Sequence, residues 1–389
     1  MKIVYLCNEY PPRPHGGIGT FVQTLSHGMR ERGHEVTVVG LAEEHDEHYD
    51  KGVRVIGLQA SKTRYLGPLA SRMALRRWLS ARAESRGIDI VEAPEFGGFL
   101  PFKVRGCRTV LRLHDSATCM ARQSGQKVGR GTFLYERATL RSNPCWIGVS
   151  QFILDLTQRT FGLAPKQSVV IYNPVGPLPD SLPDVPCLPP SYVLYAGSVS
   201  QRKGALVLAE AAREFLPSHP DLHLVFAGKL VQENGRSIAA HISEIVGLGL
   251  ARRLCFLGHL ERAAVISCMK RAKALALPSR LEALGLVVLE AMACGVPVVY
   301  TTAAAGREVI DENVTGLLAD PNSPVDVARK VARLLDDQDL ANRLASNGRR
   351  AVADRFCLEK CLEATEQVYR EWLWGPDRPR VPPDGLTEA

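Results

Sequence analysis

The feature that most constrains this chain is a proline-dense stretch that interrupts a repeating pattern of apolar and amphipathic segments. Residues 173–190 contain seven prolines and show no helical period. Proline lacks the backbone N–H that helices and central strands need, so this stretch predicts a linker. The 389 residues are also more than one compact domain normally holds. The sequence therefore predicts two domains, joined by a linker over 174–190.

Before the linker, short apolar runs alternate with longer amphipathic segments. Residues 2–8 are typical of a strand, 21–32 of a helix and 35–40 of a second strand, which is the order of a β-α-β unit. Such runs are typical of a buried parallel sheet covered by helices. We expect 1–173 to form one α/β domain. The later apolar runs of this half are 88–92, 109–113 and 146–149.

The same alternation restarts after the linker and predicts a second doubly wound domain over 191–356. A helix is expected from Pro324 to about Asp336, and a further helical stretch over 340–374. We expect its part from 357 to 375 to cross back to the first domain, and 376–389 to be a mobile tail. The fold class is thus α/β, with two Rossmann-like domains facing across a cleft. The apolar runs of this half are 192–196, 222–227, 254–257, 274–277 and 296–300.

The formal net charge of +7 is unevenly distributed. Residues 1–173 contain 24 Lys and Arg against 15 Asp and Glu, a net charge of +9, whereas 174–389 contain 24 against 26, a net charge of −2. The basic residues lack the aromatic platforms of single-strand binders, so no nucleic-acid partner is expected. An anionic membrane surface or a phosphate-bearing acceptor fits the basic half better.

The ten cysteines include no Cys-x-x-Cys pair, which argues against a zinc site or a disulfide framework. Cys357 and Cys361 are one helical turn apart, but no histidine or second pair accompanies them, so we interpret them as packed thiols. The N-terminal segment has no signal-peptide core, and no apolar run is long enough to span a membrane. These patterns predict a cytoplasmic protein.

Glycines and cations follow two of the expected strands. Gly16 and Gly17 precede the first helix, where backbone N–H groups could approach an anion, or the turn could simply need glycine. Val22 occupies the third glycine position of a dinucleotide fingerprint, so NAD binding is not expected. Arg202 and Lys203 follow the strand at 192–196 and suit a diphosphate, although such a pair is often only solvated.

Two carboxylates eight residues apart form the most specific pattern. Glu282 lies in an expected loop, and Glu290 lies inside an apolar helix. An ionised carboxylate in such a helix needs polar partners, and a pair of ribose hydroxyls would satisfy it. The alternative is a structural glutamate that caps a nearby helix.

The segment from Glu282 to Glu290, followed by Ala-Met-Ala-Cys-Gly-Val-Pro-Val-Val, resembles the signature of the retaining family-4 glycosyltransferases of the GT-B fold. The resemblance spans nearly the entire chain. Further matching segments are Gly16-Gly17, 32–36, 113–115, 149–150, 171–173, 202–204, 306–310 and 315–318.

The resemblance implies a role for each matching residue. Glu290 matches the glutamate that binds the donor ribose, and Arg202 with Lys203 matches the diphosphate clamp. His114 matches a histidine near the sugar and the leaving phosphate. Glycines of the loop over the phosphates correspond to Gly16 and Gly17. The segment that holds hydroxyls of the transferred sugar corresponds to Glu282 with the backbone of Ala283, Leu284 and Gly285.

Three positions depart from the family pattern. Ser198 stands where many relatives have arginine, so the clamp is expected to rely on Arg202. Leu284 replaces the usual phenylalanine before Gly285, and residues 173–176 read Asn-Pro-Val-Gly instead of Asn-Gly-Val-Asp.

The resemblance implies a retaining hexosyltransferase without a cofactor. No Asp-x-Asp follows an expected strand, and Asp337-Gln338-Asp339 lies at a helix end, so we expect the enzyme to be metal-independent. Its substrates would be a UDP- or GDP-linked sugar donor and a glycan or lipid-linked acceptor of cell-surface polysaccharide or glycolipid synthesis. A nucleotide-sugar epimerase and a non-catalytic nucleotide-sugar-binding protein remain as alternatives, because a fold does not determine an activity.

Residues 62–86 carry seven basic side chains and one acid, Glu84. Their apolar side, which includes Trp78, predicts peripheral contact with an anionic membrane, in which Arg72, Arg76 and Arg77 meet lipid phosphates. A scaffold helix that packs on the sheet is the alternative.

Overall fold

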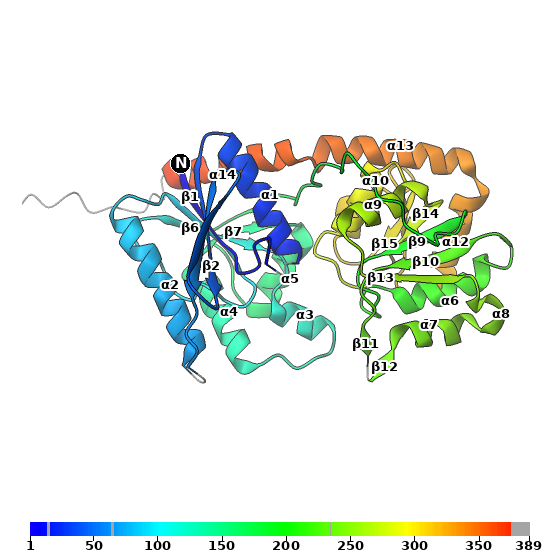
Figure 1. Cartoon of the computed structure of the whole chain (residues 1–389), viewed down its shortest axis with the longest axis horizontal. Helices are drawn as coiled ribbons and strands as arrows, with labels where there is room; N and C mark the ends of the chain where they lie inside the picture. The colour runs from blue at the N-terminus through cyan, green and yellow to red at the C-terminus, as the bar shows by residue number, and fades with distance from the viewer. Residues whose placement is uncertain (14–15, 64–65, 234, 375–389) are drawn as a thin grey trace, which may run out of the picture. The chain divides into compact units, whose positions relative to one another are not determined.

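The computed structural model describes residues 1–13, 16–63, 66–233 and 235–374 (Figure 1). The predicted tail at 376–389 lies outside these described residues. The chain separates into two compact units. Unit 1 comprises Met1–Tyr172 and the chain from Leu358 onward, and unit 2 comprises Asn173–Cys357. The proline-dense stretch belongs to unit 2, where Val175 forms an isolated bridge with Cys357.

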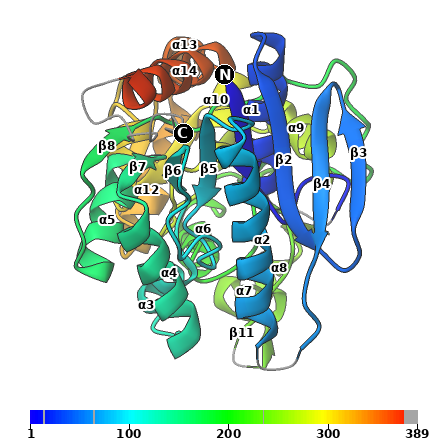
Figure 2. The same ribbon diagram turned by 90° about the vertical axis from the view of Figure 1, so that its left-hand side faces the viewer.

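Unit 1 is built on an eight-stranded sheet in the order β3-β4-β2-β1-β5-β6-β7-β8. All neighbouring strands pair in parallel except β3 and β4, which form an antiparallel hairpin at one edge (Figure 2). Every residue of β5 is buried, as expected for a central parallel strand. The strands are β1 (Lys2–Leu6), β2 (Glu35–Ala42), β3 (Asp46–Asp50), β4 (Val53–Gln59), β5 (Ile90–Pro94), β6 (Arg108–Leu113), β7 (Cys145–Gly148) and β8 (Gln167–Val170).

Helices of unit 1 bury apolar stripes against this sheet. In the first helix, Phe21, Leu25 and Met29 recur at helical spacing and join a core with Tyr5 and Ile90. Serine side chains begin two of the other helices, since they accept hydrogen bonds from the backbone N–H groups of Cys119 and Ile153. The helices are α1 (Gly17–Glu31), α2 (Gly67–Glu84), α3 (Ala117–Gln123), α4 (Arg130–Ser142), α5 (Gln151–Phe161) and α14 (Leu358–Trp374).

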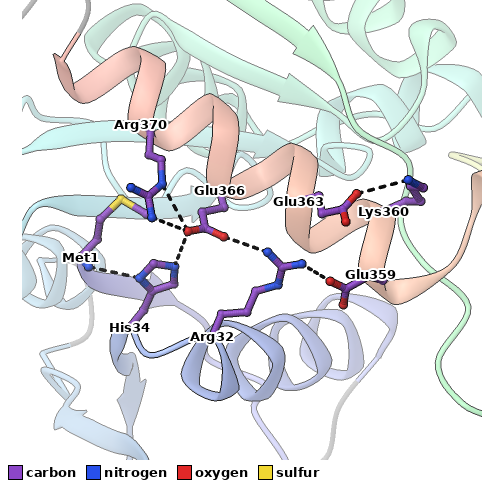
Figure 3. A network of polar contacts seen from close by, with 8 residues as sticks. All are labelled: Met1, Arg32, His34, Glu359, Lys360, Glu363, Glu366 and Arg370. Atoms are coloured by element: carbon purple, nitrogen blue, oxygen red, sulfur yellow. Dashed lines mark hydrogen bonds and ion pairs between the residues drawn. The ribbon is translucent and has the colours of Figure 1, made fainter.

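The helix α14 returns to unit 1 and packs beside α1 through a polar network (Figure 3). Glu366 accepts a hydrogen bond from Arg32 at 2.9 Å and lies 3.3 Å from the His34 ring nitrogen. Deeper in the unit, Tyr369 donates a hydrogen bond to the buried Glu92 at 2.6 Å. The segment Arg32–His34 therefore serves to anchor the last helix.

A fully buried ion pair supports the same helix from the sheet side. Glu92 of β5 accepts two hydrogen bonds from the Arg112 guanidinium, at 2.8 and 3.0 Å. Arg112 also donates to the Thr365 hydroxyl at 3.2 Å, and its guanidinium lies over the Phe21 ring. The bidentate geometry stabilises two charges that are otherwise costly to bury.

Unit 2 contains a six-stranded, all-parallel sheet in the order β13-β10-β9-β14-β15-β16. With unit 1, it confirms the predicted α/β class of two doubly wound domains. The larger strands are β9 (Tyr192–Ala196), β10 (His223–Ala227), β13 (Leu254–Gly258), β14 (Ala274–Ala276), β15 (Val298–Thr301) and β16 (Leu317–Ala319), and β11 (Gln232–Glu233) pairs with β12 (Arg236–Ser237). The helices are α6 (Ala205–Phe215), α7 (Ile238–Val246), α8 (Leu248–Ala251), α9 (Arg262–Arg271), α10 (Leu286–Ala293), α11 (Gly306–Val309), α12 (Pro324–Asp336) and α13 (Gln338–Arg355).

The predicted helical stretch at 340–374 is in fact two helices. The first, α13, ends at Arg355, and α14 begins at Leu358. Between them the Phe356 carbonyl accepts a hydrogen bond from the Val175 N–H at 2.8 Å. The break therefore falls where the chain leaves unit 2 for unit 1.

The basic helix α2 packs as part of the scaffold. Leu75 and Leu79 are fully buried, and the Arg72 guanidinium donates to the carbonyls of Gly97 and Gly98 at 2.6 and 2.8 Å. The prediction that Arg72 meets lipid phosphates is therefore wrong, because its donors are bound within the protein. Arg77 is exposed. Within the described residues, no helix is both long and apolar enough to cross a membrane.

Candidate functional site

The loops that follow β9 and β14 in unit 2 are held against each other. A Cβ atom at Gly204, where φ is +78°, would lie 2.0 Å from the Pro278 carbonyl oxygen, so glycine is required there. The Arg280 N–H donates to the Arg202 carbonyl at 3.0 Å. Because both strands are parallel, the two loops meet at the carboxyl edge of the sheet, where α/β folds bind ligands.

This close approach brings two predicted site residues together. The Lys203 ammonium lies 2.6 Å from Glu282 Oε1, and the side chains are 20% and 10% exposed. The Ser279 hydroxyl also donates to Glu282, at 3.3 Å. Arg202, the other predicted cation, makes no ion pair with any described residue and is partly exposed. Its guanidinium therefore has no internal carboxylate to displace before it binds an anion.

The segment between the two predicted glutamates has a constrained backbone. Gly285 adopts φ +87°, and a Cβ atom there would lie 2.3 Å from the Tyr300 hydroxyl. That hydroxyl donates to the Leu284 carbonyl at 3.4 Å. Ala283 is half-buried and Leu284 is buried. A glycine is thus needed to turn the chain into α10, the helix that carries Glu290.

Glu290 has a protein partner that the sequence did not reveal. Its Oε1 accepts a hydrogen bond from Arg262 Nε at 2.6 Å. The same guanidinium donates to the carbonyls of Gly176 and Pro177, at 3.2 and 3.0 Å. The Glu290 side chain remains 18% exposed, so a ligand hydroxyl could still reach it. Arg262 begins α9 and lies 28 positions before Glu290, a separation without any local pattern.

In unit 1, the predicted glycine loop lies at the start of α1. Gly16 is the residue before the helix, and a Cβ atom there would lie 3.5 Å from Glu9 Oε1. That carboxylate accepts a hydrogen bond from the Gly19 N–H at 2.9 Å. A Cβ atom at Gly17 would meet nothing within 4 Å, so packing does not explain this glycine. The first turn of α1 is thus bound by a carboxylate that the sequence interpretation had not considered.

His114 directly follows β6 and packs against the first helix. Its ring meets the Phe21 ring edge-on, with centroids 5.1 Å apart. Burial, together with the nearby Arg112 charge, lowers the pKa of His114 to about 3. The imidazole is therefore neutral at physiological pH and acts as a hydrogen-bonding group.

The predicted absence of a metal site remains a prediction. Among the described residues, no group of three or more His, Cys, Asp and Glu side chains is arranged to hold a metal ion. Asp337 instead caps α13 by accepting a hydrogen bond from the Leu340 N–H at 2.8 Å.

Two doubly wound α/β units, of which unit 2 has the Lys203–Glu282 pair at the carboxyl edge of its sheet, form the architecture of the GT-B glycosyltransferases. A "Glycosyltransferase Family 4" model matches residues 15–177, and a "Glycosyl transferases group 1" model matches residues 188–351. Between them they match most of the chain. This chain belongs to the family-4 glycosyltransferases of the GT-B fold, as its sequence predicted.

Known proteins of similar sequence or fold cover nearly the full length. Glycogen synthase of Mycobacterium tuberculosis is 26% identical over 98% of this chain and 97% of its own. Sucrose-phosphate synthase from Thermosynechococcus elongatus superposes with a TM-score of 0.74 at 22% identity, covering 95% of this chain and 98% of that one. The Anabaena protein HepE, solved with UDP and glucose, has a TM-score of 0.71 at 19% identity, with coverages of 95% and 99%.

Proposed function

We propose that this chain is a retaining hexosyltransferase that moves a sugar from a nucleoside-diphosphate donor to a glycan or lipid-linked acceptor. The observation that carries the proposal is the Lys203–Glu282 ion pair at the carboxyl edge of the unit 2 sheet. It joins a cation suited to phosphate with a carboxylate suited to sugar hydroxyls. Unit 2 would then bind the donor, and the basic unit 1 would bind the acceptor.

Cleavage of the donor places negative charge on the departing diphosphate. Lys203 and Arg202 are positioned on one loop to stabilise that charge, with Lys203 held by Glu282 and Arg202 available. Preorganised cations of this kind act most strongly in the transition state, where the charge develops. We therefore assign the clamp to Arg202 and Lys203, despite Ser198 in the usual arginine position.

The nucleoside end of the donor is assigned to Glu290. Its carboxylate is partly exposed and paired with Arg262, which supports the assignment because the pair limits the motion of the side chain. A carboxylate can accept hydrogen bonds from two ribose hydroxyls at once. The HepE structure contains UDP and glucose, which supports a UDP-linked sugar as the first donor to test.

We propose retention of the anomeric configuration because the sequence resembles the retaining family-4 enzymes, and among the described residues beside the clamp the nearest carboxylate is that of Glu282. Glu282 is bound to Lys203 and Ser279, which leaves it poorly placed to attack the sugar. We propose a front-face substitution instead. The bond from the anomeric carbon to the phosphate oxygen breaks, the bond to the acceptor oxygen forms, and the acceptor proton passes to the departing phosphate. His114, being neutral, would donate a hydrogen bond without supplying a charge.

The test combines donor binding with product analysis. UDP-, GDP-, ADP- and dTDP-sugars are screened for a rise in melting temperature, because a ligand that binds only the native state stabilises it. The stabilising donor is then incubated with glycan and lipid-linked acceptors, with and without EDTA, and the anomeric configuration of the product is read by NMR. Retained configuration with undiminished activity in EDTA supports the proposal, and inversion would contradict it.

The same experiment separates the alternatives. An epimerase would return a changed sugar that is still attached to the nucleotide, and a non-catalytic module would show the melting shift without turnover. If no nucleotide sugar raises the melting temperature, the proposal that unit 2 binds such a donor is wrong.

A further inference from the structure

Two loops of unit 1 that follow β5 and β6 are joined by buried carboxylates. Glu95 directly follows β5, and Glu136 lies on α4; both are fully buried. Glu136 accepts hydrogen bonds from the backbone N–H groups of Gly97, Ala117 and Thr118, at 2.9 to 3.1 Å. The Glu136 carboxylate therefore joins the loop that follows β5 to the start of α3. The dipole of a helix favours negative charge at that end.

Glu95 accepts hydrogen bonds from the start of the loop that follows β6. Its Oε1 accepts hydrogen bonds from the N–H groups of both His114 and Asp115, each at 2.8 Å. The backbone N–H of His114 also donates to Oε2, at 3.0 Å. His114, which we assign to the leaving phosphate, is thus held through its backbone.

The turn that Glu95 holds has an unfavourable backbone. Asp115 adopts φ +104°, a conformation that residues with a side chain rarely occupy, and it is buried. Such a strained conformation persists only where the surrounding structure determines it. The two hydrogen bonds to Glu95 Oε1 bind the peptide groups on both sides of the His114 Cα atom.

The geometry points to Glu95 as the positioning residue that fixes the His114–Asp115 turn, and thereby the His114 ring, for the glycosyl transfer step. This inference rests on the proposed function. Glu95 is not itself a catalytic residue, since it is 0% exposed and its Oε1 is committed to backbone N–H groups.

The role depends on the reach of the side chain and the presence of one acceptor oxygen. A glutamine keeps the reach of the side chain and can accept both short bonds with its amide oxygen, although it loses the longer bond from the His114 N–H to Oε2; an aspartate is one methylene too short. The two conservative variants therefore separate reach from charge. A positioning role requires kcat of Glu95→Gln to exceed that of Glu95→Asp. A role for the charge requires the opposite order.

The experiment measures kcat and the donor KM of both variants with the donor and acceptor identified for the wild type. We expect Glu95→Gln to keep kcat within about threefold, and Glu95→Asp to lose about 10- to 100-fold in kcat because the ring is misplaced. The donor KM of both should stay within about threefold, since donor contacts are unchanged. Equal losses in both variants, a greater loss in Glu95→Gln, or no loss in Glu95→Asp would overturn the inference.

A matched control tests whether lost stability alone explains the effect. Asn143 is also buried, and its amide donates to the Leu100 and Thr139 carbonyls at 2.9 Å each, but it precedes β7 at the opposite end of the sheet. Asn143→Ala should lower the melting temperature and leave kcat within about twofold. A loss of kcat as large as that of Glu95→Asp would contradict positioning by Glu95.

Hydrogen exchange of the backbone provides a readout that needs no activity. The amides of His114 and Asp115 should stay protected in Glu95→Gln and exchange faster in Glu95→Asp. If the wild type transfers no sugar, the proposed function fails while this comparison still decides whether Glu95 holds the turn. Equal protection in the two variants would show that it does not.

Discussion

The two units use carboxylates near the carboxyl edges of their sheets in different ways. In unit 1, Glu95 and Glu136 are fully buried and bond to backbone N–H groups. In unit 2, Glu282 and Glu290 have side chains that are 10% and 18% exposed, and each is paired with a cation. The first arrangement connects backbone segments of a loop, whereas the second leaves part of each charged side chain in contact with solvent, as our proposal for donor binding requires.

This difference explains how one fold combines rigid and exchangeable parts. A backbone N–H bound to a buried carboxylate cannot be replaced by a ligand without opening the loop. The Lys203–Glu282 and Arg262–Glu290 pairs keep some exposure to solvent, so a ligand could contact them without opening a loop. The comparison therefore predicts that unit 1 carboxylates govern loop structure and unit 2 carboxylates govern donor binding.

The largest expected effect comes from removing the clamp. The double change Arg202→Ala with Lys203→Ala should lower kcat by about 1,000-fold or more, because charge stabilisation is lost where it is most needed. Nucleoside binding should fall much less. The exposed adjacent pair Arg349 and Arg350 on α13 offers a matched control in the same unit, and its double alanine variant should turn over normally. If Lys203→Ala lowers kcat and Arg202→Ala does not, the assignment of Arg202 to the diphosphate clamp is wrong.

Next in size is the contrast between buried and exposed ion pairs of unit 1. Glu92→Gln leaves the buried Arg112 guanidinium without its partner, and we expect a loss of about 3–5 kcal/mol in the free energy of unfolding. Glu366→Gln, at a carboxylate that is 16% exposed, should cost only about 1 kcal/mol. Urea unfolding measures both. Similar losses in the two variants would contradict the importance of burial.

The contribution of Glu95 to stability should depend on pH. Burial raises the pKa of Glu95 from 4.5 to about 8, so its stabilising contribution is complete below about pH 4.5 and is lost as pH rises through about 8. Glutamine does not titrate. The free energy of unfolding of Glu95→Gln should therefore rise relative to wild type by roughly 1–3 kcal/mol across that interval. A constant difference between the two proteins would contradict the raised pKa.

The smallest effect concerns the exposed face of α2. Since Arg72 is bound to backbone carbonyls, Arg77→Ser is the cleaner change for testing membrane contact. One basic side chain near an anionic surface contributes about 1 kcal/mol, so sedimentation with anionic vesicles at low salt should weaken about fivefold. Neutral vesicles serve as the control. Unchanged sedimentation would leave α2 as a scaffold helix only.

Most of the parallel core could be predicted from sequence, because its strands are continuous apolar runs. Residues 192–196 and the strand at 254–258 are examples. The hairpin β3–β4 was missed, since β3 reads Asp-Glu-His-Tyr-Asp and lies at an exposed edge where no apolar pattern is required. The sequence placed the return to unit 1 at residue 357, but it predicted one continuous helical stretch over 340–374, because helical periodicity does not record where a chain passes between units.

The sequence predicted the site residues that belong to short local motifs, but not those that contact the site from distant positions in the chain. The spacing of Glu282 and Glu290 identified a segment that the structure places beside Lys203 and Arg262. Arg262 and Glu95 were not found, since each acts through a partner distant in sequence. Their contacts arise from the register of neighbouring strands and loops, which only the folded chain brings together.

The most direct test of this account is a calorimetric titration of the stabilising nucleotide sugar into wild type, Glu290→Gln and Glu95→Gln. An amide has only one acceptor for two ribose hydroxyls, so Glu290→Gln should lose about 1–3 kcal/mol in donor binding. Glu95→Gln should bind the donor as the wild type does. Unchanged affinity in Glu290→Gln, or a comparable loss in Glu95→Gln, would contradict the division between ligand-binding and loop-shaping carboxylates.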